Sequence, residues 1–158
     1  MNGASLYTVA QVRAFDRTAI DAHGIAGYDL MQSAAAAALN HLRQRWPAAR
    51  RVAIVCGGGN NGGDGYVLAR LAVAAGLDAR IVALDVPRAN SDAAHACADW
   101  AAAGGQTLDA NADLPEADVW VDAIFGTGLA RPPGGNAARW IDRLNRSGRP
   151  QLALDVPS

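Results

Sequence analysis

Residues 52–71 read VAIVCGGGNNGGDGYVLARL and combine three patterns. An apolar run rich in Val and Ile is followed by glycines interrupted only by asparagine and aspartate, and then by apolar residues at helical spacing. This order predicts a strand, a tight polar loop and the first turn of a helix, which together point backbone N–H groups at a ligand. So many glycines cost stability unless the backbone needs positive φ angles or lies close to another segment. The loop is therefore a candidate site.

The glycine pattern of this loop fits more than one function. Gly57, Gly59 and Gly62 satisfy G-x-G-x-x-G, and Asp85 closes the next apolar run, where dinucleotide folds place a ribose-binding acid. Asp64 suits a helix start but would repel a phosphate placed beside it. A Walker P-loop is excluded, because the chain has no lysine and the loop has no Ser or Thr. The purely structural alternative is a glycine-rich turn capped by Asn61 or Asp64.

The chain on both sides of this loop alternates between strand and helix patterns. We predict strands over 51–56, 79–85, 118–124 and 151–156, with a short one over 106–108, and helices over 64–75, 90–103 and 136–145. Gly76 ends the first of these helices, and Gly104 with Gly105 ends the second. This alternation predicts right-handed crossovers and a Rossmann-like, mostly parallel sheet in an α/β, three-layer α-β-α sandwich.

Two further helices are predicted before the first strand. The segment 8–23 has helical spacing with Thr8 as its N-cap, and the segment 29–45 contains an alanine run and ends before Pro47. Alanines allow close approach to another surface. We expect His23 and His41 to be surface or cap residues, because no partner stands at metal-ligand spacing around them.

Polar residues follow three of the predicted strands, where parallel sheets bind their ligands. The first strand leads into Asn60, Asn61 and Asp64, the third carries Asp122, and the fourth leads to Asp155 and Ser158. Carboxylates that converge on one edge raise a pKa or recruit a cation. Oxygen ligands alone favour a hard cation over zinc or iron. Asp155, expected to be partly desolvated at a buried strand end, is our candidate general acid or base.

Composition limits the class of protein. The 158 residues fit one domain, and 51% hydrophobic with 18% charged residues predicts a folded chain. A net charge of −1 gives no electrostatic reason to expect nucleic acid or an anionic membrane as a partner. Cys56 and Cys97 stand far apart, and no apolar run reaches the roughly 20 residues of a membrane span. We therefore expect a soluble, cytoplasmic protein.

Several segments together resemble a known family. GGGNNGGDGYVLAR, VDAIFGTGL at 121–129 and LDVPS at 154–158 are similar to three signature segments of the YjeF N-terminal domain, the NAD(P)H-hydrate epimerases. The segment YTVAQVRAFDRTAIDAHGIAGYDLMQSAA resembles the opening helices of that family. The resemblance implies that residues 1–158 form one such domain. Because these domains continue through more strands and helices, it also implies that the C-terminal part is missing.

The resemblance further implies an activity and a site. The family interconverts the R and S forms of hydrated NADH and NADPH, in nicotinamide nucleotide repair. It implies a potassium ion at Asn61, Asp122 and Ser158, proton transfer by Asp155, a dimer, and a functional link to an NAD(P)HX dehydratase. The implied substrate-binding residues are Asn60, Asn61, Gly62, Gly63, Asp64, Gly126, Thr127, Gly128, Leu129, Ala130, Arg131, Pro132 and Asp155.

Two other functions stay open at the level of sequence. One is a fragment of an NAD-binding Rossmann dehydrogenase, with pyrophosphate at Gly57 to Gly62 and ribose at Asp85. The other is a non-catalytic nucleotide-binding or scaffold module. No arginine is clearly placed for a 2′-phosphate, so the preference between the NADH and NADPH derivatives is also open.

Overall fold

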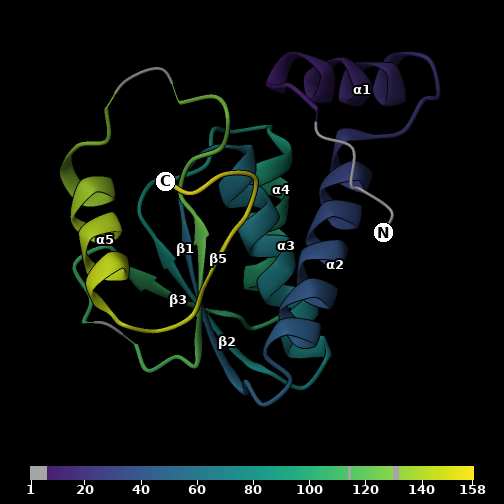
Figure 1. Cartoon of the computed structure of the whole chain (residues 1–158). Coiled ribbons are helices and arrows are strands. Elements are labelled where there is room, and N and C mark those ends of the chain that lie inside the picture. Colours follow the sequence, from purple (N-terminus) through teal and green to yellow (C-terminus); the bar gives the residue numbers. More distant parts are fainter. Residues whose placement is uncertain (1–6, 114, 130–131) are drawn as a thin grey trace, which may run out of the picture.

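The computed structural model describes residues 7–113, 115–129 and 132–158, and its elements follow the predicted alternation (Figure 1). The helices are α1 (Val9–Asp21), α2 (Gly27–Arg45), α3 (Asn60–Ala74), α4 (Asp92–Ala102) and α5 (Gly135–Arg146). The strands are β1 (Arg51–Cys56), β2 (Asp78–Ala83), β3 (Gln106–Asp109), β4 (Val119–Ala123) and β5 (Gln151–Ala153).

The five strands form one parallel sheet in the order β3-β2-β1-β4-β5. β1 lies at its centre, and the chain moves outward through β2 and β3 on one side before it returns to β4 and β5 on the other. This reversal creates a crevice beyond the carboxyl ends of β1 and β4, which is where open parallel sheets bind ligands. The predicted parallel sheet is confirmed.

Helices cover both faces of the sheet, so the predicted three-layer arrangement is also confirmed (Figure 1). One core joins α2, α3 and α4 to the sheet through side chains such as Leu42, Leu68 and Trp100. The other core joins α5 to the opposite face through Trp120 and Trp140, whose ring centroids lie 6.1 Å apart. Within the described residues, no helix is both long and apolar enough to cross a bilayer.

Helix α3 begins earlier than the sequence predicted. Its first residue is Asn60 and not Asp64, so NNGGD is the opening turn of the helix rather than a loop. Gly59 occupies the N-cap position, and no side chain caps the helix. Capping by Asn61 or Asp64 is therefore wrong. The sequence did not predict this helical turn, because glycine has a low helix propensity. Packing of the helix overrides that propensity here.

The glycines of this segment are explained by close packing. None of them has a positive φ angle. A Cβ on Gly62 would lie 1.9 Å from the carbonyl oxygen of Gly57, and a Cβ on Gly57 would lie 2.2 Å from that of Ile124. A Cβ on Gly65 would lie 2.7 Å from Cys56 Sγ. The glycines therefore let α3 lie directly against the ends of β1 and β4.

Two predicted strands end sooner than expected. The strand predicted over 79–85 runs from Asp78 to Ala83, and the one predicted over 151–156 stops at Ala153. After β5 the chain turns through Asp155, which has a φ of 66°. Aspartate is among the few residues that adopt this left-handed conformation at modest cost. Asp155 thus belongs to a turn beyond the strand.

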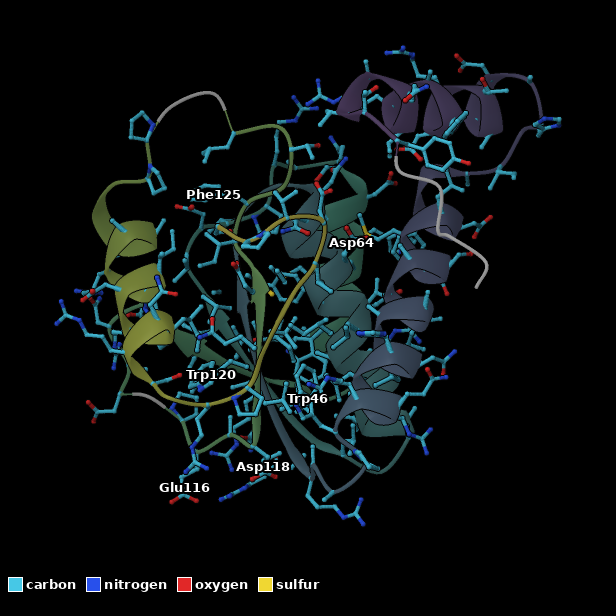
Figure 2. The ribbon with its side chains drawn as sticks, viewed as in Figure 1. Trp46, Asp64, Glu116, Asp118, Trp120 and Phe125 are labelled. Carbon is cyan, nitrogen blue, oxygen red and sulfur yellow. The ribbon has the colours of Figure 1, made fainter. Side chains whose placement is uncertain are left out.

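The amino ends of β1 and β4 are joined by a structural carboxylate. Asp118 Oδ2 accepts hydrogen bonds of 2.9 Å from the backbone N–H groups of Arg50 and Arg51, and its Oδ1 lies 3.0 Å from Arg51 Nη2. These donors lower the pKa of Asp118 well below its usual value. Figure 2 shows Asp118 and Glu116 at one end of the sheet, and Asp64 and Phe125 at the other.

Candidate active site

A cleft of about 1250 Å³ opens at the carboxyl end of the sheet. Its walls come from α1, α2, the start of α3, the loop after β4, and β5 with its following turn. A smaller hollow of about 450 Å³ lies at the far end of α2, away from every predicted site residue. Size, position and lining together make the larger cleft the candidate site.

The loop after β4 is the centre of the cleft. Asn61, in the first turn of α3, donates from Nδ2 to the carbonyl oxygen of Phe125 over 2.7 Å. The Oδ1 atom of Asn61 is buried and has no hydrogen-bond partner among the described residues. A buried carbonyl oxygen without a hydrogen-bond donor costs free energy, so this oxygen is available to a ligand or cation.

Asp122 and Ser158 are bonded directly to each other at the base of this loop. Asp122 is 7% exposed, and its Oδ2 accepts from the Ser158 N–H at 2.8 Å. Its Oδ1 accepts from the Ser158 hydroxyl at 2.9 Å and from the Ile124 N–H at 3.1 Å. The Ser158 hydroxyl in turn accepts from the Phe125 N–H at 3.0 Å. One buried carboxylate thus joins β4, the loop and residue 158.

Asp155 faces the same loop from the turn after β5. Its Oδ2 accepts a hydrogen bond of 2.7 Å from the Thr127 N–H. A Cβ on Gly126 would lie 2.4 Å from Asp155 Oδ2 and 3.6 Å from Asn61 Cβ. The absence of a side chain at Gly126 therefore leaves room for Asp155 and Asn61 to lie on either side of it. Asp155 is exposed, and the expectation that it is partly desolvated at a strand end is wrong. The strand stops before it.

The carboxylate that burial perturbs is Asp64. It lies one turn into α3, half-buried against the cleft, and burial raises its pKa to about 7. Burial is the largest cause of this value, and the negative charges of Asp155 and then Asp16 supply the rest of the rise in pKa. A carboxyl group with this pKa exchanges protons near neutral pH, which suits acid or base chemistry.

Helix α1 forms an outer wall of the cleft. It has no buried residue, and its N-terminus is held by a capping box between Thr8 and Gln11. Val12, Arg13 and Asp16 line the cleft, and Arg13 Nη2 donates to the Thr127 carbonyl oxygen over 3.3 Å. The prediction of this helix is confirmed, whereas its part in the cleft was missed.

The structure brings most of the predicted substrate-binding residues together. The cleft is lined by Asn60, Asn61, Asp64, Gly126, Thr127, Gly128, Leu129 and Asp155. Gly62 and Gly63 are buried in helix packing behind it, and Pro132 is exposed outside its lining. Ala130 and Arg131 lie outside the described residues.

Some lining residues were not predicted as part of a site. They include Arg13, Asp16, Ala34, Ala38 and His41. The alanine run of α2 was predicted to pack against another surface, but part of it faces the cleft. His41 was predicted to be a surface or cap residue, and it is exposed within this cleft. Only the tertiary arrangement of α1 and α2 reveals these positions.

The donor set around Phe125 fits a hard cation. Asn61 lines the cleft, whereas Asp122 and Ser158 line a separate hollow of about 190 Å³ between α5 and β5. Within the described residues, no three His, Cys, Asp or Glu side chains come together as a metal site. The available atoms around Phe125 are instead an amide oxygen, a hydroxyl, one buried carboxylate and a backbone carbonyl. Neutral oxygens with a single carboxylate suit a cation of low charge, and Asn61 Oδ1 is the orphaned atom that such an ion would satisfy.

Comparison with known proteins confirms the resemblance seen in the motifs. A family model described as YjeF-related protein N-terminus matches residues 27–158. The chain belongs to this family. The YjeF-related segment thus contains the whole cleft except the wall that α1 supplies.

Named relatives of this YjeF-related chain include an NAD(P)H-hydrate repair enzyme and NAD(P)H-hydrate epimerases. It is 40% identical over 149 residues to the bifunctional NAD(P)H-hydrate repair enzyme Nnr of Escherichia coli, covering 93% of this chain and 29% of that protein. It is 45% identical over 153 residues to the NAD(P)H-hydrate epimerase of Bordetella bronchiseptica, covering 95% of this chain and 64% of that protein. The chain therefore spans less than two thirds of the length of either relative.

A solved structure supports the fold. The crystal structure of yeast ynu0, YNL200c, superposes with a TM-score of 0.87 at 19% sequence identity. The alignment covers 98% of this chain and 71% of the yeast chain. At this identity the similarity shows the shared α/β fold alone.

Proposed function

We propose that this chain epimerises the R and S forms of hydrated NADH and NADPH, as an isomerase of nicotinamide nucleotide repair. The observation that carries the proposal is the convergence of Asn61, Asp122, Asp155 and Ser158 on the loop from Ile124 to Thr127. This loop borders a cleft of about 1250 Å³ that Asn61 and Asp155 line. Relatives named as NAD(P)H-hydrate epimerases support it.

The dinucleotide would occupy the space between the start of α3 and the loop after β4. Among the residues that the structure describes, no side chain caps the first turn of α3, so its N–H groups and the positive end of the helix are available to an anion. Asn60, Asn61 and Asp64 would contact the substrate from this side, with Gly62 and Gly63 holding the helix in place. Residues 126–132, including Ala130, Arg131 and Pro132, would contact it from the other.

Asp155 is the proposed proton-transfer group. A proton from its carboxyl group would pass to the hydroxyl oxygen at C6 of the ring, and the C–O bond would break with its electron pair leaving as water. The ring nitrogen stabilises the resulting cationic carbon. Water would then add to the opposite face and lose a proton to solvent, which inverts the centre. The exposed Asp155 carboxylate would regain a proton from solvent, which restores the group.

Potassium is the proposed ion of this site, held by Asn61 Oδ1, Asp122 and the Ser158 hydroxyl. When bound, it would supply a fixed positive charge beside the substrate oxygens. The unpaired, buried Oδ1 of Asn61 is the feature of this chain that supports such a ligand set. The Asp122–Ser158 hydrogen bonds orient the other two ligands.

The proposal extends to the cellular setting. A dehydratase that acts on the S form would use the product, and the bifunctional name of the Escherichia coli relative fits this link. We also propose a cytoplasmic homodimer. Co-purification with the dehydratase tests the functional link, and size-exclusion chromatography of the protein tests the homodimer.

The decisive experiment is Asp155→Asn. We expect the variant to lose epimerisation by at least about 100-fold, because a positioned proton-transfer group contributes on this scale, while dinucleotide binding stays nearly unchanged. Asp85→Asn is the matched control, since Asp85 is another exposed aspartate of the cleft. Activity is followed as loss of the R form in the presence of a dehydratase specific for the S form.

The same assay separates the alternatives. A nucleotide-binding or scaffold module would bind the dinucleotide without accelerating loss of the R form. A dehydrogenase fragment would bind ordinary NAD and would lose affinity on Asp85→Asn. Full activity of Asp155→Asn would remove Asp155 from the mechanism.

A further inference from the structure

We propose that Arg13, on α1, binds a phosphate group of the dinucleotide and so fixes the substrate in the cleft. The inference rests on the proposed function for the identity of the ligand. It adds a binding residue that lies outside the segment 27–158 matched by the family model.

The guanidinium group already lies over the loop that follows β4. Arg13 Nη2 donates to the Thr127 carbonyl oxygen at 3.3 Å, and a Cβ on Gly128 would lie 3.8 Å from the same nitrogen. This bond is long and exposed, so it contributes little and is readily exchanged for a charged acceptor. A phosphate held against residues 126–129 would be within reach of this side chain.

The charge of the cleft favours such a cation. Four aspartates line it, namely Asp16, Asp64, Asp85 and Asp155. Of the lining residues that the structure describes, only Arg13 and His41 can carry positive charge. A pyrophosphate next to several carboxylates is repelled unless a cation pairs with it. Arginine presents a planar fork of donors that matches phosphate oxygens.

Helix α1 has few other reasons to hold its position. None of its residues is buried, and Figure 1 shows it set apart from the three layers, beside the carboxyl end of the sheet. The Arg13–Thr127 bond is the side-chain hydrogen bond by which α1 meets the loop. A shared phosphate would join the helix and the loop more strongly than this bond does.

The test compares Arg13→Gln with Arg17→Gln. Arg17 is exposed on the same helix, one turn later, and does not line the cleft, so it controls for loss of net charge. We expect Arg13→Gln to raise KM for hydrated NADH by roughly ten- to hundredfold with little change in kcat, because a charge-assisted hydrogen bond is lost in binding. Arg17→Gln should stay near the wild-type protein, and Arg13→Lys should recover part of the affinity.

The same proteins are then tested with hydrated dihydronicotinamide riboside, which keeps the ring and lacks phosphate. Arg13→Gln should bind this probe as tightly as the wild-type protein does. Equal affinity of Arg13→Gln and wild type for hydrated NADH overturns the inference, as does equal loss in Arg17→Gln or equal loss for the riboside. Binding that depends on Arg13 in a protein without epimerase activity would leave the inference standing and overturn the proposed function.

Discussion

Burial and two neighbouring carboxylates both disfavour ionisation of Asp64. It is half-buried at the cleft, and Asp155 and Asp16 place two further negative charges near it. Its pKa of about 7 means that the folded protein keeps this proton at pH values where the unfolded chain, with a carboxyl pKa of about 3.9, has lost it. The folded state therefore binds more protons than the unfolded state over this range, and stability falls as the pH rises through it.

This imbalance predicts that Asp64→Asn stabilises the protein in a pH-dependent way. The full shift corresponds to a ceiling of about 4 kcal/mol, and contact with solvent in the cleft reduces it, so we expect a gain of about 1–2 kcal/mol at pH 8. The gain should shrink toward zero near pH 4, where both states hold the proton. Urea denaturation of both proteins at several pH values measures it. A gain that did not change with pH would show that the charge of Asp64 is not its source.

The Asn61 amide predicts a response to potassium. Replacing choline by potassium in the buffer should raise the melting temperature of the wild-type protein, because an ion that binds only the folded state stabilises it. Asn61→Ala should lose this response and about 1–2 kcal/mol of stability with the Phe125 hydrogen bond. Asn60→Ala is the control, since Asn60 is the exposed neighbour of a buried asparagine. An undiminished potassium response in Asn61→Ala would contradict the assignment.

Residues that follow strands could be found from the sequence, and those contributed by helices could not. The gathering of Asn61, Asp122 and Asp155 was predicted because the carboxyl ends of parallel strands meet at one edge, and all three contact the loop after β4. Arg13 lies 114 positions from its partner Thr127, and no local pattern encodes that contact. The exposure of Asp155 depends on where β5 stops, and strand ends are the least predictable part of an element.

At the scale of elements, α3 decides the shape of the site. Its glycines lie against both backbone and side chains, since a Cβ on Gly62 would meet the backbone of Gly57 and a Cβ on Gly65 would meet the side chains of Cys56 and Ala123. This contact brings Asn61 within 2.7 Å of the Phe125 carbonyl oxygen. A helix held farther away by even one methyl group would separate the amide from the loop.

Two glycines of this segment give a matched pair of variants. Gly62→Ala should lower the free energy of unfolding by about 1–3 kcal/mol, because its Cβ would meet the backbone of Gly57 and no rotamer change can relieve that contact. Gly59→Ala should cost no more than about 1 kcal/mol, since a Cβ there meets nothing within 4 Å and only the N-cap preference is lost. Thermal unfolding of the two proteins measures the difference. Equal costs would show that glycine acts here through backbone entropy rather than packing.

The existence and order of the elements followed from the sequence, while the start of α3 did not. Apolar runs and helical spacing located every strand and helix of the described chain, and Gly76 and Gly104 end α3 and α4 with positive φ angles as predicted. The NNGGD segment looked like a loop because its residues are poor helix formers. Only the close contact with β1 and β4 explains why it is helical.

At the scale of the whole molecule, the two ends of the sheet have different tasks. At the amino end, Asp118 accepts backbone and guanidinium donors that hold its charge and join β1 to β4. At the carboxyl end, Asp122 is held by donors from Ile124 and Ser158, whereas Asp64 is half-buried in the cleft and burial raises its pKa to about 7. Hydrogen bonds thus tie the strands together at the amino end, and the proposed chemistry belongs to the carboxyl end.

The two faces of the sheet are covered by different numbers of helices. This difference predicts which substitutions lower the stability of the protein without altering the site. Three helices pack on one face, whereas the core on the other depends on α5 and on Trp140, which is fully buried and donates from Nε1 to the Ala110 carbonyl oxygen at 2.7 Å. Trp140→Phe removes this bond and leaves a cavity, so we expect a loss of about 2 kcal/mol.

Trp46→Phe is the control for this variant, since Trp46 is half-buried at the end of α2 and should cost under about 1 kcal/mol. Both changes lie outside the cleft lining, so dinucleotide affinity should stay the same at a temperature where both proteins are folded. Denaturation and ligand titration of the same samples measure the two effects. If Trp140→Phe weakened binding as well, then the α5 face would have to hold the loop after β4 in position, because Ile124 and Phe125 belong to that same core.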